Sequence, residues 1–212
     1  MNSVSDPPDR SASAEPPKIL YIYREFWKSG TQAALDRIDA EAARMCIDLG
    51  CPHPYLGIES LTGPKEVWYL NGFRSFGEQE QVREQYTKKD LFATMSRFTQ
   101  QRDPFQSEPG KDAYSYYRPQ LSRGIPWILG KGRFLVIAVT SASPTLDGTV
   151  FETEQGMRFI VTPAETRTEA DAKLSSAGSS AKLFAVRPQF SMPAPEWVAA
   201  DPSFWGTSPN GP

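Results

Sequence analysis

The pattern of apolar and polar positions at the start of the chain predicts a strand and then a helix. Residues 19–27 (ILYIYREFW) form a run of β-branched and aromatic side chains, which favours a strand. Residues 31–49 carry apolar side chains at the three- and four-residue spacing of an amphipathic helix, and this pattern stops at Gly50. The chain is therefore expected to begin with a strand followed by a helix.

The same reading predicts four more elements in the first half of the chain. Residues 55–61 and 66–74 are strand-like, and residues 62–65 (TGPK) join them as a hairpin turn. Residues 78–101 have helical spacing, and residues 113–119 are strand-like again. The order β-α-β-β-α-β is that of the ferredoxin-like motif, in which both helices pack on one face of a four-stranded antiparallel sheet.

The second half of the chain predicts a shortened version of this order. Residues 133–141 form a strand, residues 149–162 a hairpin, residues 166–176 a short helix and residues 181–188 a closing strand. Only residues 142–148 separate the first two of these strands, so there is no room for a first helix.

A short repeat supports the division into halves. Residues 118–122 read RPQLS and residues 187–191 read RPQFS, 69 residues apart, and each is followed by a proline and a tryptophan. Self-similarity of this kind indicates two copies of one supersecondary unit. The predicted fold class is α+β, with a first ferredoxin-like unit over 19–127 and a second, degenerate unit without its first helix over 128–191.

The two ends differ in composition from these units. Residues 1–18 are rich in proline and serine with almost nothing apolar, which predicts a disordered tail. They also lack the basic start and apolar core of a secretory signal. Residues 192–212 are rich in proline and glycine with interspersed aromatic residues, which predicts an extended tail whose aromatic side chains pack on the body.

Composition and charge limit the partners. The 23 basic and 25 acidic residues give a net charge of −2, without the clustered basic excess typical of nucleic-acid binding. The longest apolar run, residues 134–139, is far shorter than the roughly 20 residues that span a bilayer. The chain is therefore expected to be cytoplasmic, with neither nucleic acid nor membrane as a partner.

The two cysteines admit two interpretations. Cys46 and Cys51 lie five residues apart around the end of the first helix, so a disulfide between them fits an oxidising compartment. Reduced structural thiols in the cytoplasm are the favoured interpretation. His53 is the only histidine and lies nearby, but these three residues lack the four ligands of a structural zinc site, so no metal is expected.

The element order and the strand Glu66–Phe73 (EVWYLNGF) resemble the dimeric α+β barrel superfamily over residues 18–191. Its members include NIPSNAP-like proteins, antibiotic-biosynthesis-type monooxygenases and heme-degrading monooxygenases. The resemblance implies that two ferredoxin-like units pair sheet to sheet, either within one chain or in a homodimer. Trp68 and Asn71 are similar to the Trp and Asn that some of these monooxygenases employ. No cofactor is expected, and heme is the alternative that the resemblance implies.

Side chains alternate between the two faces of a strand, so the strands of the first unit can be divided into two sets. The helices are expected to cover the apolar set, which contains Leu20, Ile22, Leu56, Ile58, Trp68 and Leu70. The facing unit or a second chain is expected to cover the aromatic set, which contains Tyr21, Tyr23, Glu25, Tyr55, Glu59, Tyr69, Asn71, Phe73, Tyr114, Tyr116 and Arg118.

The aromatic set has two interpretations. It forms either a core between sheets with paired tyrosine hydroxyls or a pocket for a small apolar or aromatic ligand. In the second case Tyr23, Tyr69 and Tyr116 are the walls, and Glu59, Asn71 and Arg118 orient the ligand. A guanidinium can clamp a carboxylate with two hydrogen bonds. Ligand binding is therefore one role for Arg118 and its repeat mate Arg187, and a structural ion pair with Glu59 or Glu152 is the other.

These residues predict a small-molecule-binding protein. The alternative is an enzyme acting on an aromatic or carboxylate-bearing small molecule, such as a cofactor-independent or heme-linked monooxygenase, an isomerase or a decarboxylase. In that enzyme Arg118 would bind the carboxylate, and Glu59 or His53 would move a proton. A structural protein whose tyrosine face contacts another chain is the second alternative. The sequence contains no Gly-x-Ser-x-Gly, Gly-x-Gly-x-x-Gly or Walker pattern, so hydrolase and nucleotide chemistry have no support.

Overall fold

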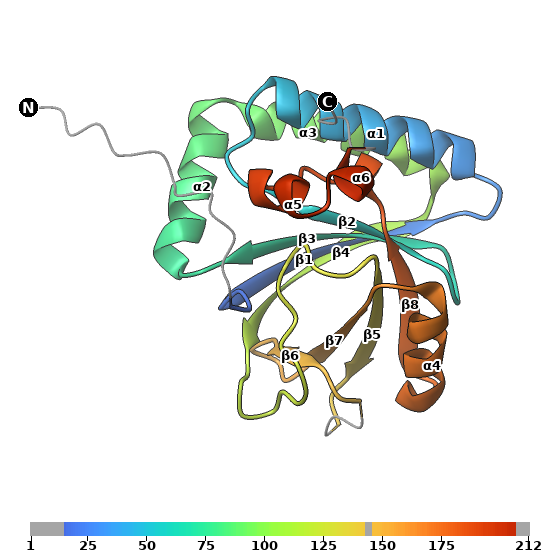
Figure 1. The fold of residues 1–212 in the computed structure, drawn as a ribbon. Coiled ribbons are helices and arrows are strands. Elements are labelled where there is room, and N and C mark those ends of the chain that lie inside the picture. The colour runs from blue at the N-terminus through green and yellow to red at the C-terminus, as the bar shows by residue number, and fades with distance from the viewer. Residues whose placement is uncertain (1–14, 143–145, 207–212) are drawn as a thin grey trace, which may run out of the picture.

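The computed structural model describes residues 15–142 and 146–206, and in them eight strands form a closed antiparallel barrel (Figure 1). Their order around the barrel is β1-β3-β2-β8-β5-β7-β6-β4. The barrel closes within one chain, so no second chain is needed to complete it. The strands are β1 (Ile19–Trp27), β2 (Leu56–Ser60), β3 (Glu66–Phe73), β4 (Gln106–Tyr117), β5 (Phe134–Thr140), β6 (Thr149–Glu152), β7 (Arg158–Ala164) and β8 (Ala181–Val186).

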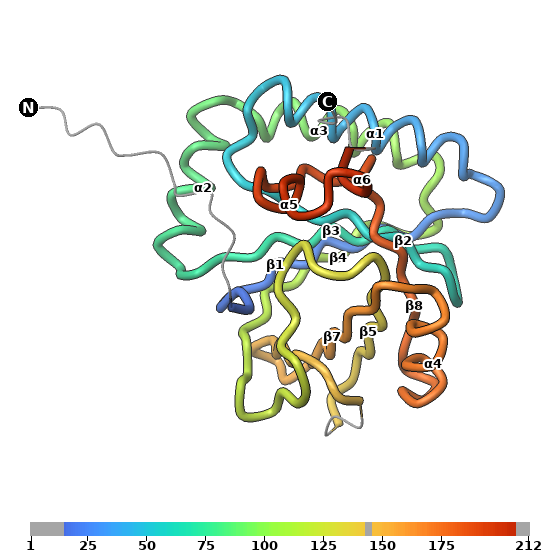
Figure 2. The backbone as a smooth tube through the Cα atoms, in the orientation of Figure 1, coloured from blue at the N-terminus to red at the C-terminus, as the bar shows by residue number. Residues whose placement is uncertain are grey.

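Helices cover the outside of the barrel unevenly. The longest ones lie over the strands of the first half, and one helix lies beside β8 in the second half (Figures 1 and 2). The helices are α1 (Gln32–Asp48), α2 (Phe76–Lys88), α3 (Leu91–Arg102), α4 (Arg167–Ala177), α5 (Pro195–Ala200) and α6 (Pro202–Trp205). Among the described residues none of these helices is both long and apolar enough to cross a membrane.

The helix expected over residues 78–101 is two helices. α2 and α3 are separated at Asp90, whose φ of 52° lies in the left-handed region. Aspartate adopts this conformation more readily than most residues because its short polar side chain can bond locally. The apolar spacing continues across the break, which is why the sequence pattern did not reveal it.

One apolar cluster fills the interior of the barrel and collects side chains from all its strands. The members from the first half are Leu20, Ile22, Leu56, Ile58, Trp68 and Leu70, with Ala113 and Tyr117 packed against them. The members from the second half are Trp127, Leu135, Ile137, Phe151, Phe159, Val161, Phe184 and Val186. Five of these side chains are aromatic and no more than 3% exposed, so the barrel centre is a packed core.

The assignment of the two strand faces is therefore the reverse of the expectation. The apolar set faces the barrel interior, and the tyrosines lie beneath the helices. Tyr55 clusters with Cys46 of α1 and Leu91 of α3, and Tyr21 packs against a cluster that contains Val82 of α2. An interior closed on all sides favours side chains without polar atoms, whereas a tyrosine between sheet and helix can direct its hydroxyl to a polar partner or to the rim.

The repeated motif lies at the two seams where the halves of the barrel join. Residues 187–191 follow β8 at its seam with β2. The N–H of Arg187 donates to the carbonyl of Gly57 at 2.9 Å. The Ser191 hydroxyl accepts the Gly57 N–H at 2.9 Å and donates to the Arg187 carbonyl at 2.8 Å. A Cβ at position 57 would lie 2.6 Å from the carbonyl oxygen of Phe190, so only glycine allows this approach.

Residues 118–122 make the same contacts at the seam between β4 and β6. The N–H of Arg118 donates to the Val150 carbonyl at 2.8 Å. The Ser122 hydroxyl accepts the Val150 N–H at 2.9 Å and donates to the Arg118 carbonyl at 2.8 Å. Each motif thus fastens the last strand of one half to the second strand of the other.

Replacing Ser191 with alanine should destabilise the protein. The change leaves the buried Gly57 N–H without its acceptor, which typically costs about 1–3 kcal/mol. Urea unfolding followed by circular dichroism would measure the loss. Ser96→Ala on the exposed side of α3 is the matched control. Equal stability of the two variants would show that the seam contact contributes little.

The C-terminal segment differs from the extended tail that was expected over 192–212. Its described part forms α5 and α6, and Trp197 and Trp205 belong to the barrel cluster. Asp201 begins α6 by accepting the N–H of Phe204 at 3.2 Å, a helix start that the proline-rich composition concealed. Of the tail expected over 1–18, residues 1–14 lie outside the described part of the chain, as do residues 207–212.

Candidate functional site

The residues expected to line a pocket do not converge on one point. The rings of Tyr23 and Tyr69 are stacked with centroids 6.3 Å apart on the helix-covered face. Tyr116 instead contacts the ring of Phe76 at the start of α2, with centroids 5.8 Å apart. The Asn71 amide donates to the carbonyl of Pro54 at 3.4 Å, which ties β3 to the loop before β2.

Arg118 and Arg187 form the ion pairs that were the structural alternative to ligand binding. Nε of Arg118 lies 3.0 Å from Glu152, and Nε of Arg187 lies 3.3 Å from Glu59. Glu59 is buried and also contacts Lys65. These pairs stand beside the two seams, and a role of either arginine in ligand binding stays a prediction.

The lone histidine is held in place by the chain around it. Nε2 of His53 lies 2.8 Å from the carbonyl oxygen of Gly72, so this nitrogen carries the proton and donates. The ring is stacked on Phe73 with centroids 4.6 Å apart and is buried.

Beneath the helices lies a buried ionic cluster that the sequence analysis did not identify. Arg102 at the end of α3 lies between Glu25 of β1, at 3.0 Å, and Asp39 of α1, at 2.8 Å. The side chains are 4%, 0% and 1% exposed, respectively. The indole N–H of Trp27 donates to Glu25 at 3.3 Å, and Arg102 lies 3.5 Å from the Tyr69 hydroxyl.

Two carboxyl groups share one guanidinium in this cluster, and each keeps an unsatisfied oxygen. Oδ2 of Asp39 has no hydrogen-bond partner, and Oε1 of Glu25 meets Arg102 at an angle that makes an ion pair without a hydrogen bond. Burial raises the pKa of Glu25 to about 7, although Arg102 acts in the opposite direction. Burial also raises the pKa of Asp39. Burial therefore favours the protonated form of both carboxyl groups, against the attraction of Arg102.

The sequence carried two signals for this cluster. Glu25 lies on the same strand face as Tyr21 and Tyr23. Asp39 occupies the buried stripe of α1, beside Leu35 and Ile38, where an acidic side chain requires a buried partner. The partner, Arg102, could not be identified because it lies 63 residues further along the chain.

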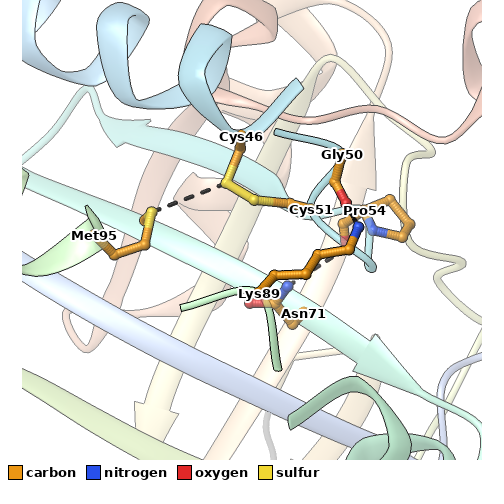
Figure 3. The surroundings of a disulfide bond; sticks show 7 residues. All are labelled: Cys46, Gly50, Cys51, Pro54, Asn71, Lys89 and Met95. Atoms are coloured by element: carbon orange, nitrogen blue, oxygen red, sulfur yellow. Dashed lines mark hydrogen bonds between the residues drawn. A yellow bond between two sulfur atoms is a disulfide. The ribbon is translucent and has the colours of Figure 1, made fainter. Parts of the chain in front are cut away.

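The cysteines form a disulfide, Cys46–Cys51, instead of the favoured reduced pair (Figure 3). The turn at Gly50, with φ of 59°, reverses the chain after α1 and brings Cys51 back to Cys46. The Lys89 ammonium donates to the Gly50 carbonyl at 2.8 Å. A cavity of about 410 Å³ lies beside the disulfide, and its lining includes Cys46, Cys51, His53, Pro54, Met192 and Val198. Location in the cytoplasm stays a prediction.

A second, larger cavity of about 530 Å³ adjoins the barrel interior; we call it the aromatic cavity. It lies between the loop over residues 128–133 and the helices α5 and α6. Aromatic and charged side chains share its lining: Trp197, Phe204, Trp205, Lys131, Arg133, Glu165, Glu196 and Asp201. Neither cavity is lined by the residues that the sequence suggested as a ligand pocket.

Close packing holds the aromatic cavity in shape. The rings of Trp197 and Trp205 lie with centroids 5.5 Å apart, and both side chains are buried. The backbone of Gly130 lies against the Trp197 ring so closely that a Cβ there would come within 2.4 Å of it. Gly130 also has a φ of 87°, and this left-handed backbone conformation is a second reason for glycine at the position. The aromatic wall therefore depends on this glycine.

Candidate ligands for a metal ion or heme are few among the described side chains. Within the described ranges no group of three or more His, Cys, Asp and Glu side chains is placed to hold a metal ion. The one imidazole of the chain directs Nε2 at the Gly72 carbonyl, and both cysteine sulfurs are bonded to each other. The histidine Nε2 and both cysteine sulfurs therefore already have partners, so they do not fit the role of an axial heme ligand.

The fold and its cavities define an α+β protein with a closed antiparallel barrel and an aromatic cavity beside the barrel core. No family model and no curated protein sequence matches the chain. The chain is similar to several solved structures, three of which follow. An anthrone oxidase-like protein has 11% identity and a TM-score of 0.46, with 80% of this chain and 92% of that chain covered.

The other two structures are equally remote in sequence. A candidate monooxygenase from Fusobacterium nucleatum subsp. nucleatum has 10% identity and a TM-score of 0.41, covering 85% of this chain and 94% of that chain. A mutant chlorite dismutase from Candidatus Nitrospira defluvii has 9% identity and a TM-score of 0.43, covering 82% and 92%. At these identities and TM-scores the likeness assigns neither a superfamily nor an activity to this chain.

Proposed function

We propose that the protein binds a small molecule in the aromatic cavity between residues 128–133 and the helices α5 and α6. The observation that carries the proposal is the lining of this cavity. A volume of about 530 Å³ lies within the range of small-molecule sites, and aromatic walls with a few charged groups are typical of them. Side chains fill the barrel centre, so the ligand site lies beside the barrel core.

We propose further that the fold is a dimeric α+β barrel contained in one chain. Two observations support two ferredoxin-like units. The strand orders β4-β1-β3-β2 and β8-β5-β7-β6 run in the same sense around the barrel. The motifs over 118–122 and 187–191 also make matching hydrogen bonds at the two seams.

The enzyme alternatives have less support than binding. Glu59 forms ion pairs with Lys65 and Arg187, and it lines neither of the two cavities described above. His53 lines the cavity beside the disulfide, but its Nε2 proton is donated to Gly72. A monooxygenase, isomerase or decarboxylase would need one of these groups directed at a substrate.

A thermal-shift screen with small aromatic compounds tests the binding proposal. At a concentration near 100 times its Kd a ligand stabilises the folded state by roughly 2.7 kcal/mol, which for a chain of this size raises Tm by roughly 5–10 °C. Ala200 lines the aromatic cavity, so Ala200→Trp should abolish the shift by filling it.

The neighbouring Ala199 provides the matched control. It is exposed on the same helix and does not line the cavity, so Ala199→Trp should retain the shift. If every ligand stabilises both variants equally, the aromatic cavity is not the binding site. If no compound of the screen stabilises the parent protein, the binding proposal fails.

A further inference from the structure

The charges around the aromatic cavity do not balance within it. The lining contains three acidic side chains and two basic ones. Arg133 is neutralised by Asp201, with 2.7 Å between Nη2 and Oδ2, and the Phe204 ring lies over the guanidinium at 5.1 Å. Glu165, Glu196 and the exposed Lys131 remain, so the rest of the lining has one carboxylate in excess.

Glu196 is the carboxylate that most needs a partner. Its Oε1 is buried and has no hydrogen-bond partner among the described residues. No side chain of the described ranges forms an ion pair with Glu196 or Glu165. A buried carboxylate oxygen without a donor destabilises the protein, because the oxygen has lost its water and gained no hydrogen bond. A ligand that donates to this oxygen would remove the cost.

The aromatic wall, like the Glu196 carboxylate, favours a positively charged ligand. Trp197, which directly follows Glu196, and Trp205 both line the cavity, and their rings lie with centroids 5.5 Å apart. The face of an indole carries negative electrostatic potential and attracts organic cations more strongly than any other side-chain ring. A neighbouring carboxylate and two indole rings therefore act together on a positive charge.

We propose that the aromatic cavity selects an amine in its ammonium form, attached to an aromatic or similarly apolar group. This inference rests on the proposed function, because it names the class of ligand for the same site. The ammonium group would donate to Oε1 of Glu196, and the apolar group would pack on Trp197 and Trp205. Lys131 is exposed and Arg133 is already paired with Asp201, so neither offers a buried, unpaired cation to a carboxylate ligand.

Three probes of one size separate charge from shape: phenethylamine, 2-phenylethanol and phenylacetate. None has tryptophan-like fluorescence, so quenching or a shift of the total emission of the five tryptophans at pH 7 reports binding to the full-length protein. We expect phenethylamine to bind about tenfold more tightly than 2-phenylethanol, the effect of a cation against aromatic and carboxylate partners. Phenylacetate should bind more weakly than the alcohol.

Variants assign the preference to the carboxylate. Glu196→Gln should reduce phenethylamine affinity about tenfold and leave that of 2-phenylethanol unchanged. Glu80→Gln, an exposed change on α2, is the matched control. Should Glu196→Gln fail to fold, as judged by circular dichroism, Glu165→Gln makes the corresponding test from the other side of the cavity.

The outcomes separate this inference from the binding proposal. Tighter binding of phenylacetate, or equal binding of amine and alcohol, would overturn the inference and leave a small-molecule site in place. Binding of phenethylamine that Glu196→Gln does not weaken would also overturn it. If none of the probes binds, the inference is overturned. The proposed function also fails if the wider screen finds no compound that stabilises the parent protein and loses this effect in Ala200→Trp.

Discussion

Replacing Arg102 with methionine should destabilise the protein by about 3–5 kcal/mol, because the change leaves two buried carboxyl groups without a cation. Glu25 and Asp39 are almost completely buried, and Arg102 is the only base paired with them among the described residues. Urea unfolding at pH 7 measures the loss. The deficit should shrink at pH 4, where both carboxyl groups of the variant can be protonated.

Arg97 offers the matched control for this prediction. It lies on the exposed side of the same helix, so Arg97→Met should change the free energy of unfolding by no more than about 0.5 kcal/mol. Similar losses from Arg97→Met and Arg102→Met would mean that the cluster contributes little to stability. A deficit of Arg102→Met that is the same at pH 4 and pH 7 would mean that packing, not charge, is the cause.

Glu25 should make the protein less stable as the pH rises from about 4.5 to about 7. Its pKa is near 7 in the folded protein and 4.5 in the unfolded chain, because burial disfavours the charged form. Below pH 4.5 the group is protonated in both states and has no effect. Above that value the unfolded chain loses the proton first, so unfolding becomes easier until the folded protein also ionises.

The Glu25→Gln variant isolates this effect. Between pH 4 and pH 8 its free energy of unfolding should rise relative to that of the parent by about 3 kcal/mol, since one pKa unit corresponds to about 1.4 kcal/mol. Asp39, Arg102, Tyr23 and Tyr69 face the same group and remain in both proteins. Denaturant unfolding over a series of pH values supplies the curves.

A partly exposed glutamate provides the control for this pH series. Glu41 of α1 is partly exposed and paired with Arg37 at 3.6 Å, so Glu41→Gln should give a curve nearly parallel to that of the parent. If the curves of Glu25→Gln and the parent are also parallel, Glu25 titrates in the folded protein much as it does in the unfolded chain.

Local patterns were sufficient to predict most elements of the fold. The strand at 19–27, the helix after it and the hairpin over 55–74 depend on periodicity and turn residues that lie close together in the chain. The break at Asp90 and the helices α5 and α6 were not anticipated. The first is a single backbone angle, and the second depends on a cap and on aromatic packing against the barrel.

The direction of the two strand faces could not be predicted in the same way. Alternation separated Leu20 and Ile22 from Tyr21 and Tyr23 correctly, but it does not indicate which of the two sets faces the helices. Which set meets the helices depends on where the connections cross the sheet, and that follows from closure of the whole barrel. Beneath the helices the Tyr69 hydroxyl lies 3.5 Å from Arg102, a polar contact that the apolar barrel interior does not offer.

The site residues illustrate the same limit. The ion pairs Arg118–Glu152 and Arg187–Glu59 were among the alternatives that the sequence left open, because the repeat drew attention to both arginines. The lining of the aromatic cavity joins residues 128–133 to residues 196–205, and no sequence pattern connects these segments. The tryptophans of the C-terminal segment were the one available signal.

The two seams have a consequence for how the barrel responds to dilution. A barrel assembled from two separate chains loses stability as protein concentration falls, because its halves must meet by diffusion. Here β2 meets β8 and β4 meets β6 within one molecule, so closing both seams is a unimolecular event. Either half alone would expose two strand edges with unpaired N–H and carbonyl groups, which invite aggregation. Covalent connection keeps those edges matched at any concentration.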